Sequence, residues 1–262
     1  MIFRWFRQFQ RHQLWKRPIP TGWHELLSEN AVFLEDVEEE TKTAILRSVQ
    51  VFCSEKNWEG CGGLKLTDEH RVTISAQIAK MTLGMGVGEV DGEYFSEVQS
   101  ILVYPEAYLA DTKQHIGAGV VMESRDGRLG EAWHRGPVIL SWQDVLATGR
   151  RQNFARNVVI HEFAHHLDMR NGRDADGIPV IESSEFGRRW REVTESCFGQ
   201  LQEMCRNGRP RLLDCYGATS LSEFFAVASE AFFEEPLAMR HHWPQLFDLF
   251  NAFYFPNDFA QI

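Results

Sequence analysis

Residues 158–168 read VVIHEFAHHLD and contain the pattern His-Glu-x-x-His. The spacing of aliphatic residues predicts a helix over 153–169, with Gly172 as its stop signal. Positions four apart on a helix lie on one face, with Cβ atoms about 5–6 Å apart. His161 and His165 can therefore reach one metal ion, and Glu162 can lean over the same ion. The segment predicts a helix that carries a metal site.

Zinc gives such a site a hydrolytic chemistry. It lowers the pKa of a water ligand to about 7, and a neighbouring carboxylate can take the proton of that water as it attacks a carbonyl. Glu162 is placed for that role. The alternative is a solvated helix face that bears His, Glu and His by chance. The aliphatic residues 158–160 and Leu167 disfavour it, because burying unligated polar groups is costly.

A third protein ligand is needed, and neither an H-x-x-G-x-x-H continuation nor a nearby cysteine follows His165. The later segment SLSEFFAVASEAFFEE, residues 220–235, offers carboxylates instead. Glu223 and Glu230 are seven positions apart and therefore share a helix face. Ser220 and Glu223 also match a capping box, in which the glutamate only satisfies backbone N–H groups. The residues alone leave Glu223 and Glu230 as equal candidates.

The elements around the motif predict an α+β fold that is mostly helical, with a small mixed sheet before the active-site helix. Helices are expected over 38–56, from Thr67 to the glycines at 84–88, over 184–206, and as two further helices split at Pro236. Strands are expected at 101–104, 120–122 and 138–140. The order of helices, sheet and helices is typical of segregated α+β proteins.

Composition narrows the possible functions. The chain has 262 residues, 44% of them hydrophobic, and a net charge of −10. This acidic balance argues against direct nucleic-acid binding as the main function. The five cysteines form no C-x-x-C pair, so reduced thiols are expected. The sequence shows no transmembrane-length apolar run and no secretory signal, and we therefore expect a cytoplasmic protein.

The first 20 residues form a distinct basic and aromatic N-terminal segment, followed by a single predicted domain over 21–262. The segment alternates Arg with Phe and Trp and has no acidic residue, since the first is Glu25. It could lie on an acidic membrane surface as an amphipathic helix, or pack on the body of the protein. Packing is the favoured interpretation.

Several blocks of the sequence resemble the Mlc titration factor A family of bacterial cytosolic zinc metallopeptidases. These are Tyr104-Pro105, Trp133 with Gly136-Pro137, Leu140-x-Trp142, HEFAHHLD at 161–168, and YGATSLSEFFAVASE at 216–230. The last two blocks are also similar to the catalytic end of the anthrax lethal factor type of metallopeptidase. That type has an H-E-F-x-H-x-x-D motif and a Tyr seven residues before an E-F-F-A helix.

The resemblance implies a zincin-like (gluzincin) domain with one Zn²⁺ per chain. It makes His161, His165 and Glu223 the metal ligands, Glu162 the general base and Tyr216 the group beside the substrate carbonyl. A phenol hydroxyl can stabilise the oxyanion of a tetrahedral intermediate, although Tyr216 could also be an ordinary half-buried residue. Asp168 is open to two interpretations, a partner for a zinc-bound histidine or a cap of the helix end.

Two functions follow as hypotheses. The first is a zinc-dependent peptidase that acts on peptide substrates, with the aminopeptidase preference that the resemblance suggests. The second comes from the resemblance alone: binding of the glucose repressor Mlc, which would regulate the glucose phosphotransferase system. One molecule could do both. The alternative is a non-catalytic regulatory protein that sequesters a transcriptional repressor.

Overall fold

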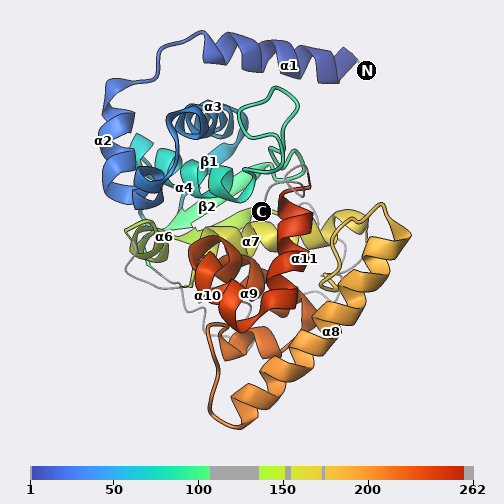
Figure 1. Ribbon diagram of the computed structural model, residues 1–262. Helices are drawn as coiled ribbons and strands as arrows, with labels where there is room; N and C mark the ends of the chain where they lie inside the picture. Colours follow the sequence, from blue (N-terminus) through green and yellow to red (C-terminus); the bar gives the residue numbers. More distant parts are fainter. Residues whose placement is uncertain (1, 107–135, 151–154, 173–174, 257–262) are drawn as a thin grey trace, which may run out of the picture.

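The computed structural model describes residues 2–106, 136–150, 155–172 and 175–256 (Figure 1). In chain order the elements are α1 (Ile2–Trp15), α2 (Thr21–Asn30), η1 (Val32–Asp36), α3 (Glu39–Glu55), β1 (Asn57–Gly60), α4 (Asp68–Met81), β2 (Ser100–Tyr104), β3 (Val138–Ser141), α6 (Trp142–Gly149), α7 (Val158–Asp168), η3 (Met169–Asn171), α8 (Ser184–Arg206), η4 (Cys215–Ala218), α9 (Leu221–Glu234), α10 (Pro236–His242) and α11 (Pro244–Tyr254). The predicted α+β class with mostly helical content is confirmed.

The three described strands pair in the order β1-β2-β3, and both pairs are parallel. The sequence predicted a mixed sheet, but no antiparallel pair occurs among the described strands. Helix α4 makes the crossover that parallel pairing of β1 and β2 requires. Strand β1 was not predicted, because its sequence NWEG has no apolar run and none of its residues is fully buried. The strand expected at 120–122 lies outside the described residues.

Most helix boundaries follow the predicted capping signals. Thr67 caps α4 in a reciprocal box with His70, and α8 spans the predicted 184–206. Two helices were expected in the C-terminal part, whereas the structure has α9, α10 and α11 there. Pro236 and Pro244 each occupy the first turn of a new helix, where a missing N–H costs nothing. The second of these breaks was not predicted.

Helix α7 lies in the middle of the molecule and packs against α4, β3, α6 and α9 (Figure 1). Its aliphatic and aromatic side chains Val159, Ile160 and Phe163 are fully buried. Glu162 and His165 are only half-buried, so this side of the helix remains accessible. The buried side fixes the helix firmly, and the accessible side is where the predicted chemistry lies.

A disulfide joins Cys205 at the end of α8 to Cys215 in η4, with Cα atoms 5.7 Å apart. The expectation of reduced thiols is therefore wrong for this pair. The turn after α8 contains Gly208 and Leu212 at positive φ and returns the chain to the helix end, which the spacing in sequence could not reveal. Cys53, Cys61 and Cys197 are free. Within the described residues, no helix is long and apolar enough to cross a membrane.

The N-terminal segment forms α1, which packs on α3 through one face. Arg11 is buried and pairs with Glu55 through Nε and Nη2, at 2.7 and 2.8 Å. Its guanidinium also lies 4.0 Å from the ring centroid of Tyr94. Trp15 donates from Nε1 to the carbonyl oxygen of Arg47 at 3.0 Å. Packing of this segment on the body, the favoured interpretation, is confirmed for this face.

Candidate metal centre

Helix α7 begins later than the sequence predicted, and its cap explains why. Asn157 accepts the N–H of Ile160 with its side-chain oxygen at 3.0 Å, which makes it the N-cap. At the other end, Gly172 has a φ of 77° and closes the short helix η3 that follows Asp168. The predicted stop at Gly172 is confirmed. These ends place His161 in the first turn and His165 in the last.

The structure brings His161, His165 and Glu223 together from α7 and α9. Their candidate ligand atoms all lie within 4.8 Å of one another. Nε2 of His161 is 3.3 Å from Nε2 of His165, and Oε2 of Glu223 lies 3.1 and 3.5 Å from these two nitrogens. The side chain of His161 is buried, whereas those of His165 and Glu223 keep 17% and 16% of their surface exposed. The cluster is therefore reachable from solvent.

These separations fit a tetrahedral zinc site. Ligand atoms about 2.0–2.2 Å from zinc at tetrahedral angles are about 3.3–3.6 Å apart. The three edges of the triangle, 3.1, 3.3 and 3.5 Å, match that spacing closely. Two imidazole nitrogens and one carboxylate oxygen are also a donor set that zinc accepts in catalytic sites.

A second observation is the pairing of the remaining polar atoms. Nδ1 of His161 lies 2.7 Å from Oε1 of Glu230, and Nδ1 of His165 lies 3.0 Å from the hydroxyl of Ser222. A carboxylate can only accept, so Nδ1 of His161 donates to Glu230. Nε2 of His161 then faces Glu223 Oε2, a buried oxygen without a hydrogen bond among the described residues. A proton on Nε2, or a metal ion held by both atoms in its place, compensates the negative charge of Glu223.

The charges of the site favour the same conclusion. Burial lowers the pKa of His161, but the contacts with Glu223 and Glu230 outweigh burial and raise that pKa to about 10. Burial also raises the pKa of Glu223, and the two histidines overcome it and hold this pKa well below its usual range. The cluster thus attracts positive charge, which a divalent metal ion supplies.

Glu162 lies beside the cluster and has a raised pKa. Burial is the main cause, the negative charges of Glu223 and Glu230 add to it, and the two histidines act in the opposite direction. A carboxyl whose pKa is raised holds a proton more readily, which suits it to exchange protons with a group beside the cluster.

Glu223 and Glu230, equal candidates from the residues alone, have different surroundings. Ser220 accepts the N–H of Glu223 at 3.1 Å, so the cap of α9 forms, but the carboxylate of Glu223 turns toward His161 and His165. Glu230 lies on the far side of His161, where Oε2 also accepts the N–H of Asn157 at 2.5 Å. Glu223 thus belongs to the cluster, and Glu230 orients His161.

Asp168 serves parts of both predicted roles. It accepts the N–H groups of Gly177 and Ile178 at 2.8 and 2.9 Å, which ties the following loop to the end of α7. It also bonds to Ser222, whose hydroxyl contacts Nδ1 of His165. Asp168 therefore reaches His165 through Ser222. Sequence reasoning missed Ser222, because a serine at the start of a helix ordinarily indicates a cap.

Tyr216 lies in η4, next to the cluster. Its ring centroid is 6.1 Å from that of His161. Asp214 caps this short helix by accepting the N–H of Tyr216 at 2.8 Å, and the disulfide of Cys215 fixes the preceding residue to α8. These two constraints hold the tyrosine close to the predicted metal ligands.

A comparison with known protein families gives one match over nearly the whole chain. The profile of the family described as glucose-regulated metallo-peptidase M90 matches residues 4–255. The chain belongs to this family. Membership of the M90 family makes the protein metallopeptidase-like and is consistent with the cluster of two histidines and a glutamate.

Relatives of this M90 chain extend over most of its length. An uncharacterised protein of Synechocystis sp. is 32% identical over 247 residues, covering 94% of this chain and 88% of the relative. Mlc titration factor A of Klebsiella pneumoniae is 31% identical over 245 residues, covering 92% and 89%. Mlc titration factor A of Escherichia coli is 30% identical over 234 residues, covering 88% and 84%. The resemblance expected from the sequence is confirmed.

Proposed function

We propose that this protein is a zinc-dependent peptidase in which His161, His165 and Glu223 hold one Zn²⁺ per chain. The observation that carries the proposal is the buried oxygen of Glu223, which faces two imidazole nitrogens without a hydrogen bond in the described part of the chain. Their spacing suits tetrahedral zinc, and the M90 family supplies the class of enzyme.

Bound zinc would polarise a peptide carbonyl and lower the pKa of a water ligand. Each neighbouring residue then has a task of its own. Glu162 takes a proton from the attacking water and delivers it to the leaving amine. Tyr216 donates from its hydroxyl to the oxygen of the tetrahedral intermediate. Glu230 and Ser222 orient His161 and His165 through their Nδ1 atoms.

The proposed substrates are peptides, with a preference for small substrates that have a free N-terminus. This preference rests on the resemblance to the Mlc titration factor A family. Strand β3 is an outer strand of the described sheet and packs against α7. An extended peptide that added to β3 by backbone hydrogen bonds would therefore run beside α7.

The test is Glu162→Gln, assayed with a series of chromogenic aminoacyl substrates and with N-terminally blocked peptides. We expect the variant to retain zinc and to lose turnover, because glutamine cannot exchange the proton. Glu192→Gln on α8 is the matched control, since Glu192 is exposed and pairs only with Arg188 in the described structure. Turnover by Glu162→Gln at the rate of the parent protein would show that the assigned role is wrong.

A second proposed function is binding of the repressor Mlc, supported by the name shared by several relatives. We place the protein in the cytoplasm for this role, although the Cys205–Cys215 disulfide removes one of the arguments for that location. The test is a titration of purified Mlc into the parent protein and into His165→Ala. Loss of cleavage with retained binding would mean independent functions. Loss of both would mean that the metal supports the interface, and no binding by either protein would refute this role.

A further inference from the structure

The outer face of α1 exposes a cluster of aromatic side chains. Trp5, Phe6 and Phe9 are 66%, 52% and 48% exposed, and the rings of Trp5 and Phe9 stack with centroids 6.0 Å apart. Only two other large hydrophobic residues of the described chain are exposed, Val180 and Leu237. Such a concentration of apolar surface on one helix usually indicates a contact surface.

This aromatic face is separate from the face that holds α1 to the body. Arg11 lies two positions after Phe9, about 200° around the helix, and is buried against Glu55 and Tyr94. Trp15 bonds to the backbone of α3 from the same packed side. The helix is therefore already docked by the side of Arg11 and Trp15, and this contact leaves Trp5 and Phe9 66% and 48% exposed.

Positive charge accompanies the aromatic residues. Lys16 and Arg17 are exposed, and the described structure shows no ion pair from either of them to a carboxylate. Lys16 and Arg17 directly follow Trp15, the last residue of α1. Arg7 is exposed too, but it lies two positions before Phe9 and therefore on the side of Arg11. No acidic residue precedes Glu25, although the whole chain has a net charge of −10. The basic charge is thus concentrated at the aromatic helix.

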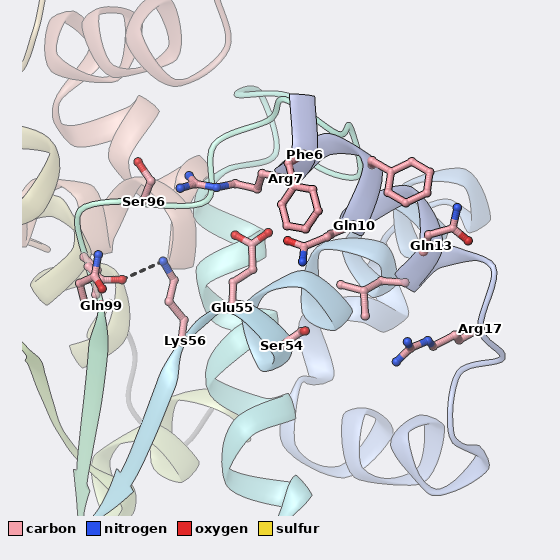
Figure 2. Close-up of a pocket in the computed structure, with 13 residues that line it drawn as sticks. Phe6, Arg7, Gln10, Gln13, Arg17, Ser54, Glu55, Lys56, Ser96 and Gln99 are labelled. Carbon is pink, nitrogen blue, oxygen red and sulfur yellow. Dashed lines mark hydrogen bonds between the residues drawn. The ribbon is translucent and has the colours of Figure 1, made fainter. Parts of the chain in front are cut away.

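A groove lies beneath α1, between this helix and the junction of α3 with β1, and Figure 2 shows the side chains that line it. Phe6 and Phe9 line it, as do Arg7 and Arg17. Its two inner charges are already engaged: Glu55 pairs with Arg11, and Lys56 donates to three backbone carbonyls at 2.5–2.9 Å. The groove therefore offers no unpaired buried charge for a small ion, and its aromatic rim continues the exposed face.

We propose that α1 docks this protein on an anionic lipid surface. Trp5, Phe6 and Phe9 would enter the interface at the level of the headgroups, and Lys16 and Arg17 would contact lipid phosphates. A two-fold dimer through the same face is disfavoured, because it would bring the basic side chains of both copies together. A lipid surface gives these side chains the opposite charge.

The test is co-sedimentation of the full chain, tagged at its C-terminus, with two kinds of vesicle. One is pure phosphatidylcholine and the other contains equal parts of phosphatidylcholine and phosphatidylglycerol. We expect binding to the anionic vesicles only, weakened by added salt. Lys16→Gln/Arg17→Gln should weaken binding about 25-fold, at about fivefold for each basic side chain. Trp5→Ser/Phe9→Ser should weaken it by about tenfold or more.

Matched controls use the same substitutions elsewhere. Leu237→Ser removes another exposed apolar side chain, and Arg189→Gln/Arg191→Gln removes two exposed charges on α8. Both should bind as the parent protein does. Equal binding to neutral vesicles, or unchanged binding of Trp5→Ser/Phe9→Ser, would overturn the proposal. A parent dimer that this double variant converts to a monomer, without vesicle binding by either, would instead make a second copy the occupant.

Discussion

The variant Glu230→Gln tests whether Glu230 holds the predicted metal ligand His161 in its orientation. Glu230 accepts two hydrogen bonds, from Nδ1 of His161 at 2.7 Å and from the N–H of Asn157 at 2.5 Å. A glutamine amide has one acceptor oxygen, so one of the two donors must face an NH₂ group. The side chain of Glu230 is 8% exposed, and water cannot readily replace the lost acceptor.

The size of the effect on zinc affinity and on stability depends on which of the two donors loses its acceptor. If His161 loses its acceptor, its ring is no longer held with Nε2 toward the cluster, and zinc affinity falls about 10-fold to 100-fold. This corresponds to about 1.4–2.7 kcal/mol, since a factor of ten is 1.36 kcal/mol. If Asn157 loses its acceptor instead, the folded state loses about 1–3 kcal/mol. The lost negative charge weakens zinc binding in either case, so we expect the affinity change to dominate.

The assay is competition for zinc with a chromophoric chelator at pH 7, alongside thermal unfolding with and without zinc. Glu234→Gln is the control: it makes the same change one helical turn later, at a carboxylate that bonds to the side chains of Asn157 and Lys80. It should lower stability with little change in zinc affinity. Unchanged zinc affinity in Glu230→Gln, or equal losses in both variants, would refute the orienting role of Glu230.

Three further predictions concern the tyrosine and the cysteines. Tyr216→Phe should lower kcat about 10²-fold to 10³-fold and keep zinc, as peptide hydrolysis and metal analysis would show, since only the donor to the oxyanion is lost. Cys205→Ala/Cys215→Ala should lower the free energy of unfolding in urea by about 3 kcal/mol, because the bridge closes a short loop in the unfolded chain; an unchanged value would contradict a formed disulfide. Burial raises the pKa of Cys53 to about 12, so its thiol should resist alkylation at pH 8 in the folded protein and react in urea, as mass spectrometry would detect.

The sequence predicted what depends on local spacing. The helix that carries His161 and His165, the cap at Thr67 and the stop at Gly172 all follow from short-range patterns, and the structure contains each of them. The choice between Glu223 and Glu230 could be made only from the three-dimensional structure. Both lie on the same face of α9, and only the packing of α9 against α7 places one inside the cluster and the other behind His161.

Features that depend on chain reversals or tertiary packing were not predictable in this way. The disulfide forms because a turn with residues at positive φ brings Cys215 back to α8. The spacing of the cysteines in the sequence does not predict that turn. Strand β1 has no apolar pattern, and its pairing with β2 defines it. Ser222 contacts His165 only because α9 begins beside the end of α7.

The most direct test of the central claim is X-ray absorption at the zinc edge, on protein purified without added metal or chelator. The account predicts about one zinc per chain with two imidazole nitrogens at about 2.0–2.1 Å, further oxygen ligands and no sulfur. In Glu223→Ala the zinc should be lost or the carboxylate contribution should disappear, while Glu192→Gln should give the parent spectrum. A parent protein without zinc after zinc is offered, sulfur in its first shell, or an unchanged spectrum in Glu223→Ala would contradict the proposed site.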